Sequence, residues 1–230
     1  MNVKVLQLID GAKKATGTTV IIDVFRAFSL EAYLFSKGVS KIIPTADTET
    51  AYRLKREDPD LILAGERGGK ILPGFDVGNS PSEIRTLDLK GKTVIHTTSA
   101  GTQGIANATS ADEILGAGLV NAAATAKYIK KKAPENVSLV CMGLAATEPT
   151  DEDTLCATYI KSLLEGKALD LETEIQKLRY TSGAKFFDEA QNAIFPTQDF
   201  FMCTKTDVFD FIIKLRSNGT DMPYMVKECV

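Results

Sequence analysis

The hydrophobic residues fall into short runs that are separated by segments with helical spacing. The runs "TTVIIDVF" (18–25) and "VSKIIPTA" (39–46) are rich in apolar and β-branched residues, as buried strands are. The segment between them, "AFSLEAYLFSKG" (27–38), has apolar residues at helical spacing and ends at a glycine, a common helix stop. Together the three segments predict a β-α-β unit.

The pattern continues with a second helix and a third strand. "DTETAYRLKRED" (47–58) begins with an aspartate suited to capping a helix, and Ala51 and Leu54 follow at helical spacing. "DLILAGE" (60–66) is short and apolar, and it predicts the next strand. This part of the chain therefore predicts the order β-α-β-α-β.

The same order returns about 74 residues further along the chain, which we interpret as an internal duplication. The two similar halves cover about 18–67 and 92–143 and are joined by a loop. The alternative is coincidence, because any two α/β segments share this general pattern. The segments that align are "TVIIDVFRAFS" from Thr19 with "TVIHTTSAGTQ" from Thr93, "KIIPTA" with "EILGAG" from Glu113, "TAYRLKRE" with "AATAKYIKK" from Ala123, and "DLILAGE" with "NVSLVCMG" from Asn136.

This order predicts an α/β fold in a single domain over 1–230, with α/β/α layers around a mainly parallel sheet. A C-terminal, α-rich segment is expected over about 150–230, because "LETEIQKLRYTSGAKFF" (171–187) and "TDVFDFIIKL" (206–215) have apolar residues at helical spacing. "PYMVKECV" (223–230) is compatible with an edge strand or a terminal arm.

Charged, hydroxyl and glycine residues gather where the first and third strand of each half end. If both halves are parallel and right-handed, these ends lie at one edge of the sheet, where open α/β sheets bind ligands. The pair Glu66 and Arg67 stands among glycines at such a strand end, where charge seldom serves solubility alone. We expect a shared crevice that is lined by Asp23, Arg26, Gly65, Glu66, Arg67, Thr97, Thr98, Ser99, Gly101 and Gly143.

Composition narrows the choice of partner. The chain of 230 residues is 44% hydrophobic and carries 27 Lys+Arg against 30 Asp+Glu. This balance argues against nucleic acid or an anionic membrane and favours a small molecule. The N-terminus lacks a signal-peptide pattern and no apolar run approaches the ~18 residues of a membrane helix, so we expect a cytoplasmic protein. The aromatic-rich stretch 199–212 is typical of a core and is also compatible with a homodimer contact.

The loop "HTTSAGT" (96–102) offers hydroxyls and helix-start N–H groups to an oxyanion. Arg26 and Arg67 at neighbouring strand ends favour this interpretation, because guanidinium suits bidentate binding of oxyanions. The alternative is that these hydroxyls only cap a helix. Asn79 and Ser80 in "GFDVGNSP" fit a binding role and a turn equally well.

The acidic residues indicate a hard cation. Asp23, Glu66, Glu152 and Asp153 offer oxygen ligands without imidazole or thiolate, the chemistry that Mg²⁺ prefers. For Glu152 and Asp153 the alternative is stabilisation of a helix dipole by acids in its first turn. The sequence contains no P-loop, no dinucleotide fingerprint, no C-x-x-x-x-x-R motif and no D-x-D motif at Asp23. The available chemistry is therefore that of carboxylates, arginines, hydroxyls and a metal.

Seven motifs occur in a recognisable order: "IDVFRAFS" (22–29), "LAGERGG" (63–69), "GFDVGNSP" (74–81), "TTSAGT" (97–102), "GLVNAAA" (118–124), "CMG" (141–143) and "EDTLCA" (152–157). Through them the chain resembles the 2-phosphosulfolactate phosphatases, enzymes of coenzyme M biosynthesis. The resemblance covers about the first 165 residues and is weak beyond them. It departs at Ser99 or Ala100, where the family commonly has an asparagine.

The resemblance implies a Mg²⁺-dependent phosphoric monoester hydrolase that converts 2-phospho-3-sulfolactate to 3-sulfolactate and phosphate. The roles of single residues are assigned from their chemistry. The ligands assigned to Mg²⁺ are Asp23, Glu66 and Asp153. The catalytic residues are Arg26 and Arg67, which stabilise charge on the phosphoryl group, and Glu152, which positions or deprotonates water. The residues assigned to the substrate are Ser29, Asn79, Ser80, Thr97, Thr98, Ser99, Gly101 and Thr102.

Three alternatives stay open at this point. Asp23 could form a covalent phospho-aspartate instead of binding metal. A phosphatase of the same fold could act on another small phosphorylated hydroxy acid. A non-enzymatic oxyanion-binding protein would use the carboxylates only to pair with Arg26 and Arg67.

Overall fold

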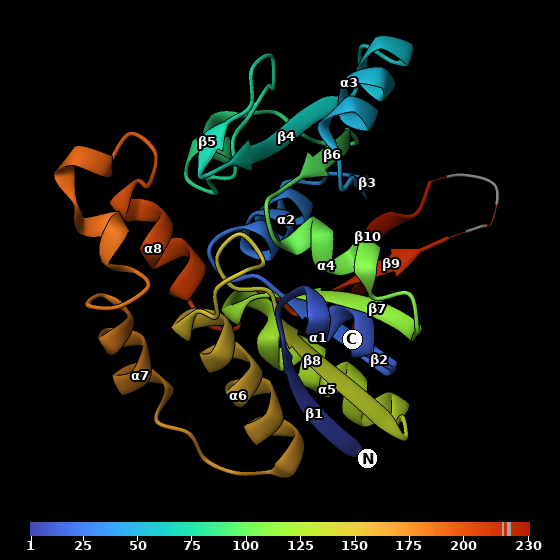
Figure 1. Cartoon of the computed structure of the whole chain (residues 1–230), viewed down its shortest axis with the longest axis vertical. Coiled ribbons are helices and arrows are strands. Elements are labelled where there is room, and N and C mark those ends of the chain that lie inside the picture. Colours follow the sequence, from blue (N-terminus) through green and yellow to red (C-terminus); the bar gives the residue numbers. More distant parts are fainter. Residues whose placement is uncertain (218, 220–221) are drawn as a thin grey trace.

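A computed structural model describes residues 1–217, 219 and 222–230, and its strands form one ten-stranded sheet (Figure 1). The strands are β1 (Asn2–Gln7), β2 (Gly17–Ile22), β3 (Lys41–Pro44), β4 (Ile62–Arg67), β5 (Lys70–Ile71), β6 (Thr93–Thr97), β7 (Ala111–Ala117), β8 (Asn136–Cys141), β9 (Phe211–Arg216) and β10 (Tyr224–Cys229). The α-helices are α1 (Leu8–Lys14), α2 (Ala27–Ser36), α3 (Thr48–Glu57), α4 (Gly101–Asn107), α5 (Ala122–Lys132), α6 (Asp151–Glu165), α7 (Leu171–Leu178) and α8 (Thr197–Thr204). Short 3-10 helices are η1 (Glu83–Thr86), η2 (Leu119–Asn121), η3 (Ala184–Phe187) and η4 (Glu189–Gln191).

The strand order β1-β8-β2-β7-β9-β10-β3-β6-β4-β5 reveals how the two halves are arranged. Each half has the predicted sequence of three strands and two helices, which confirms the α/β fold with two similar halves. The halves are interleaved, however. Strand β2 of the first half lies between β7 and β8 of the second, and β6 of the second lies between β3 and β4 of the first.

The parallel strands form two groups that run in opposite directions. Strands β1, β8, β2 and β7 are mutually parallel, as are β3, β6 and β4. Strands β9 and β10 join the groups through antiparallel pairs. The expectation of one common sheet edge is therefore wrong in detail. Neighbouring strands in a sheet are rotated by about 20–25°, and this accumulated twist turns the ends of the two groups toward each other.

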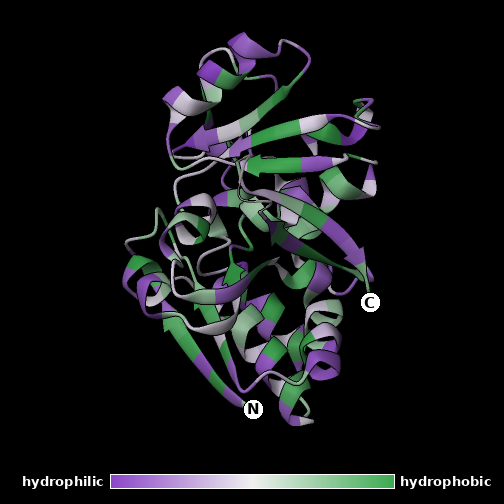
Figure 2. Cartoon of the chain, turned by 90° about the vertical axis from the view of Figure 1, so that its right-hand side faces the viewer, coloured by the Kyte–Doolittle hydropathy of each residue, from purple (hydrophilic) through white to green (hydrophobic). Residues whose placement is uncertain are grey.

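Both faces of the inner strands are buried, which explains their unbroken apolar runs. Along β2, Val20 and Ile22 pack into one hydrophobic cluster with Ile160 of α6, whereas Ile21 packs into another with Phe28 of α2. Alternate side chains of a strand point to opposite faces, so helices must cover both faces of the sheet. Figure 2 shows the resulting concentration of hydrophobic residues along the strands.

The C-terminal segment differs from its prediction. Helices α6, α7 and α8 are present, but the stretch predicted as a helix over 206–215 contains strand β9. The buried residues Phe211, Ile212 and Ile213 form a continuous apolar run, whose periodicity fits a buried strand as well as a helix. Strand β10 is a central strand between β9 and β3, not an edge strand or an arm. Among the described residues, no helix combines the length and apolar character needed to span a membrane.

Candidate functional site

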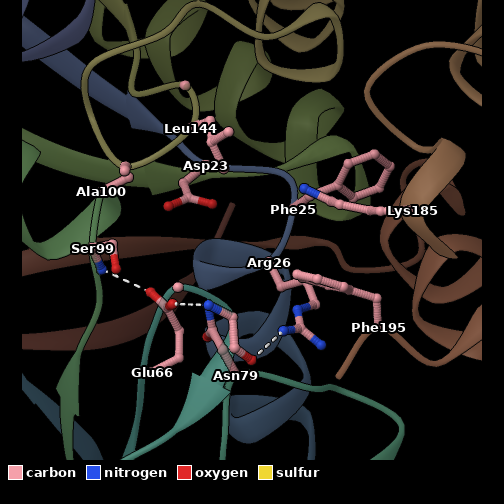
Figure 3. A pocket seen from close by; sticks show the side chains of 14 residues that line it. Asp23, Phe25, Arg26, Glu66, Asn79, Ser99, Ala100, Leu144, Lys185 and Phe195 are labelled. Carbon is pink, nitrogen blue, oxygen red and sulfur yellow. Dashed lines mark hydrogen bonds between the residues drawn. The ribbon is translucent and has the colours of Figure 1, made fainter. Parts of the chain in front are cut away.

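A cavity of about 260 Å³ lies where β2, β4, β6 and β8 end (Figure 3). The loops that follow these four strands supply most of its wall, and the C-terminal segment supplies the rest. The predicted crevice at the strand ends is therefore present. Its lining residues are Asp23, Phe25, Arg26, Glu66, Gly68, Gly69, Asn79, Ser99, Ala100, Gly143, Leu144, Ala145, Lys185 and Phe195.

Asp23 follows β2 directly and is almost fully buried in the cavity wall. One carboxylate oxygen accepts a hydrogen bond from the amide of Ala27 at 3.2 Å, and the other accepts one from the amide of Gly101 at 2.9 Å. Burial, together with the negative charges of Glu66 and Glu152, raises the pKa of Asp23 to about 6. This carboxylate lacks a cationic partner among the described residues, and a bound cation would favour its charged form.

Glu66 and Arg67 point in different directions, as successive residues of a strand do. The Glu66 carboxylate lines the cavity and accepts hydrogen bonds from the amides of Ser99 at 2.8 Å and Gly69 at 2.6 Å. The Arg67 guanidinium donates instead to the main-chain oxygen of Glu66 and to the hydroxyl of Thr97. Arg67 is not among the residues that line the cavity, so only Glu66 faces the crevice.

Arg26 lines the cavity, but much of its guanidinium is engaged by the protein. Nη1 donates to Asp199 Oδ2 at 2.8 Å and to the main-chain oxygen of Ile194 at 3.0 Å. Nη2 donates to the main-chain oxygen of Gly69 at 3.2 Å. Arg26 therefore ties the C-terminal segment to the loop after β4, and Asp199 fixes its position. Asp199 was not among the predicted site residues, because its place in the first turn of α8 resembles that of an ordinary dipole-stabilising acid.

Glu152 and Asp153 lie behind the wall and not in the cavity lining. The Asp153 carboxylate accepts hydrogen bonds from the amides of Val24 and Gly143, each at 2.8 Å, and thereby joins the ends of β2 and β8. Burial raises the pKa of both acids. Oε2 of Glu152 is buried without a hydrogen-bond partner among the described residues. Neither side chain contacts the cavity, so the assignments of Asp153 to metal and of Glu152 to water lack a direct geometric basis.

Three of the four hydroxyls of "TTSAGT" bond to groups of the protein itself. Thr98 and Thr102 exchange hydrogen bonds between amide and hydroxyl at 3.0 and 3.1 Å, which tie the loop to the first turn of α4. The hydroxyl of Thr97 accepts from Arg67, and the amide of Gly101 donates to Asp23. These bonds engage Thr97, Thr98 and Thr102 within the protein, and an oxyanion role for this loop stays a prediction. Ser99 is the predicted substrate residue of this loop that lines the cavity.

The remaining predicted substrate residues also differ in whether they line this cavity or bond only within the protein. The hydroxyl of Ser29 donates to the main-chain oxygen of Val24 in the interior. The hydroxyl of Ser80 donates to Asp199, and Ser80 lines a neighbouring cavity together with Arg26 and Asn79. Asn79 lines the cavity. Its position is set by a buried chain that the sequence analysis missed: Asn79 Oδ1 lies 3.2 Å from His96 Nε2, and His96 Nδ1 lies 2.9 Å from Glu31 Oε1.

Lys185, Phe25 and Phe195 are also cavity residues that the sequence analysis missed. Phe195 and Lys185 lie far from the recognised motifs in sequence, and only the fold brings them to the strand ends. Figure 3 shows Asp23, Glu66 and Ser99 on one side of the cavity, with Arg26 and Lys185 on the other. The cavity therefore has an acidic side and a basic side.

The acidic side fits a hard cation in its donor chemistry. Within the described residues, no group of three or more Asp, Glu, His and Cys side chains is arranged to hold a metal by itself. Mg²⁺, however, commonly binds through one or two carboxylates together with water and substrate phosphate. Asp23 and Glu66, which both face the cavity, are the carboxylates that meet this requirement.

Comparison with known proteins places this chain in a family. A family model described as 2-phosphosulpholactate phosphatase matches residues 4–218. The chain belongs to the 2-phosphosulpholactate phosphatase family. This match extends well beyond the part in which the sequence motifs were recognised, and it includes Lys185 and Asp199. Membership of this phosphatase family makes the chain a phosphoric monoester hydrolase and argues against a non-enzymatic binding protein.

Relatives with the name "Probable 2-phosphosulfolactate phosphatase" occur in several organisms. The Bacillus subtilis relative is 31% identical over 87% of this chain and 87% of its own length. The Thermoplasma volcanium relative is 31% identical over 90% of this chain and 94% of its own length. The Caldicellulosiruptor saccharolyticus relative is 40% identical over 63% of this chain and 61% of its own length.

Proposed function

We propose that this protein is a Mg²⁺-dependent phosphatase that hydrolyses 2-phospho-3-sulfolactate to 3-sulfolactate and phosphate. The observation that carries the proposal is the polarity of the cavity. Two carboxylates, Asp23 and Glu66, face two cationic side chains, Arg26 and Lys185, across a space suited to a small molecule. A phosphorylated acid needs both sides of the cavity, because its phosphate and its other anions each require a positive partner. A cation held by the acidic side would serve the phosphate, and the basic side would serve the other anions.

Asp23 and Glu66 are the proposed Mg²⁺ ligands. When bound there, the ion would supply positive charge to polarise the phosphoryl oxygens. The amides that donate to each carboxylate fix its orientation before any ion or substrate arrives. We propose that Asp153 acts indirectly, by holding the main chain beside Asp23 through its bond to Val24.

We propose that water attacks the phosphorus atom in line with the ester bond. The oxygen of water forms the new P–O bond and the bond to the sulfolactate oxygen breaks. One proton of the water passes to that oxygen, which leaves as a hydroxyl, and the other stays on the phosphate. Arg26 would stabilise charge on the phosphoryl oxygens through the N–H groups that its protein partners leave available. Arg67 and Glu152 would support the site from behind the wall, since neither lines the cavity.

The first prediction is that the purified protein releases phosphate from 2-phospho-3-sulfolactate and that EDTA abolishes this release. Mg²⁺ should restore turnover fully and Mn²⁺ at least partly, because both ions prefer oxygen ligands. Phosphate release is measured in samples whose metal content has been verified. Full turnover by metal-free protein would refute the metal requirement.

The same assay separates the proposed substrate from its rival. Phospholactate and phosphoglycolate carry the phosphate and a carboxylate without a sulfonate. If either of them is hydrolysed with a much higher kcat/KM than 2-phospho-3-sulfolactate, the protein is a phosphatase for another small phosphorylated hydroxy acid.

A further inference from the structure

Lys185 places an ammonium group at the cavity wall within a cluster of aromatic rings. Its Nζ lies 5.3 Å from the centre of the Phe195 ring, 5.6 Å from that of Phe186 and 6.0 Å from that of Phe25. The side chain is half-buried, and it lines the cavity together with Phe25 and Phe195. In the part of the chain that the structure describes, this ammonium forms no hydrogen bond and no ion pair.

The rings are held by each other and so give Lys185 a defined position. Phe186 is fully buried and makes edge-to-face contacts with Phe25 at 4.9 Å and with Phe195 at 5.8 Å between ring centres. Aromatic rings attract a cation without using its N–H donors. The ammonium of Lys185 is therefore both localised and available to accept a ligand.

Arg26, the second cationic side chain of the cavity wall, is hydrogen-bonded to the protein. Arg26 is 3% exposed, and it donates to Asp199, Ile194 and Gly69. Most N–H donors of Arg26 thus bond to the protein, whereas the ammonium of Lys185 makes no hydrogen bond among the described residues. In Figure 3 the Lys185 side chain extends toward the middle of the cavity, opposite Glu66 and Ser99.

We infer that Lys185 is a specificity-determining residue that binds an anionic group of the substrate other than its phosphate. The inference rests on the proposed function, because it names the part of the substrate that the basic side recognises. The group is a carboxylate or a sulfonate, both of which accept hydrogen bonds from an ammonium. Substrates with such a second anion are favoured over simple phosphate monoesters.

The test compares Lys185→Met, Lys185→Arg and Lys205→Met. Methionine keeps an unbranched apolar stem against the rings, and arginine keeps the positive charge. Lys205 is an exposed lysine that lies outside the cavity lining, so Lys205→Met is the matched control. The kcat and KM of each variant are measured with 2-phospho-3-sulfolactate, phospholactate and p-nitrophenyl phosphate, whose phosphate is its sole anionic group.

Lys185→Met should raise the KM for 2-phospho-3-sulfolactate by about 10–100-fold, the range expected for loss of a charged hydrogen bond. The loss of kcat/KM should be clearly smaller for p-nitrophenyl phosphate. Lys185→Arg should recover part of the loss, and Lys205→Met should behave as wild type. An equal loss for phospholactate would assign Lys185 to the carboxylate, whereas a loss confined to the sulfonate compound would assign it to the sulfonate. Equal losses on all three compounds would overturn the inference.

A binding measurement keeps this inference separate from the proposed function. The melting temperature is followed with increasing 3-sulfolactate or inorganic phosphate, which requires no turnover. Wild type should be stabilised by both compounds, and Lys185→Met should lose most of the response to 3-sulfolactate while keeping that to phosphate. If wild type does not release phosphate from 2-phospho-3-sulfolactate but this difference in binding is found, the proposed function fails and Lys185 still binds the second anion. If 3-sulfolactate stabilises both proteins equally or neither, the inference fails.

Discussion

Asp23, Glu66 and Asp153 are buried carboxylates near the cavity, and each accepts hydrogen bonds from two main-chain N–H groups. Glu66 bonds to Ser99 and Gly69, and so joins the end of β6 to the loop after β4. Asp153 bonds to Val24 and Gly143, and so joins the ends of β2 and β8. The two acids thus perform equivalent tasks in the two strand groups. Asp153 positions these loops without lining the cavity, whereas Glu66 both positions its loop and faces the cavity.

Asp23 allows a prediction about pH. Its carboxyl has a pKa of about 6 in the folded protein, above the ordinary value of 3.8. The folded state therefore retains this proton over a range in which the unfolded chain has lost it. The stability that Asp23 contributes is fully present below the ordinary pKa, and it is lost as the pH rises toward about 6. Asparagine does not titrate, so Asp23→Asn removes this dependence.

The second prediction is the resulting difference between wild type and Asp23→Asn. In EDTA, the free energy of unfolding of wild type minus that of the variant should fall from about pH 4 to about pH 6 and then level off. Urea unfolding at several pH values measures both free energies. The subtraction removes titrating groups that do not interact with Asp23, such as Glu113, whose pKa is lowered to about 2 by hydrogen bonds from Lys132 and Lys214. A difference that does not change with pH would contradict the raised pKa.

At the scale of elements, β10 is a short strand with a central place in the sheet. It pairs with β9 along its whole length and with β3 through Met225. It therefore connects the two groups of parallel strands. The sequence alone was compatible with an edge strand or a terminal arm, because which strands flank β10 depends on long-range pairing.

The third prediction concerns Met225, which is fully buried in the centre of this connection. Met225→Ala should lower the free energy of unfolding by about 2–5 kcal/mol, the cost of leaving a cavity in a packed core. Cys229→Ala on the same strand should change it by less than ~0.5 kcal/mol, because Cys229 is exposed. Chemical denaturation measures both variants. Equal, small effects would mean that β10 is only a peripheral strand.

At the scale of the whole molecule, the interleaved strand order makes the two halves depend on each other. Strand β2 completes the group β8-β2-β7, and β6 completes the group β3-β6-β4. A separated first half would keep β3 and β4 without β6 between them. A separated second half would keep β7 and β8 without β2 between them. This arrangement also brings loops from both halves to the same cavity, as Glu66 of the first half and Ser99 of the second illustrate.

The fourth prediction is that fragments 1–91 and 92–230 do not fold separately but assemble when mixed. The cut falls in the exposed turn around Gly91, so it removes little besides chain continuity. Each fragment alone should lack a cooperative urea transition, and an equimolar mixture should recover one together with native-like circular dichroism. A cooperative transition in fragment 1–91 alone would show that the first half is an independent unit, contrary to the interleaved arrangement.

The sequence by itself determined the order of strands and helices in both halves and the placement of Asp23, Glu66 and Ser99 at or just after strand ends. These features follow from local periodicity and from the rule that parallel strands present their ends to ligands. The motifs were also sufficient to indicate the family.

Only the tertiary structure decided which neighbour each strand has and where each polar side chain points. Pairing between β2 and β8 or between β6 and β4 joins residues that are distant in the chain, and no local pattern encodes the choice. The same limit applies to single residues: Thr98 and Thr102 satisfy each other, Arg67 turns to Thr97, and Lys185 arrives from the C-terminal segment. Residue type defines the chemistry that a side chain can perform, but long-range packing decides whether that chemistry faces the cavity or the protein interior.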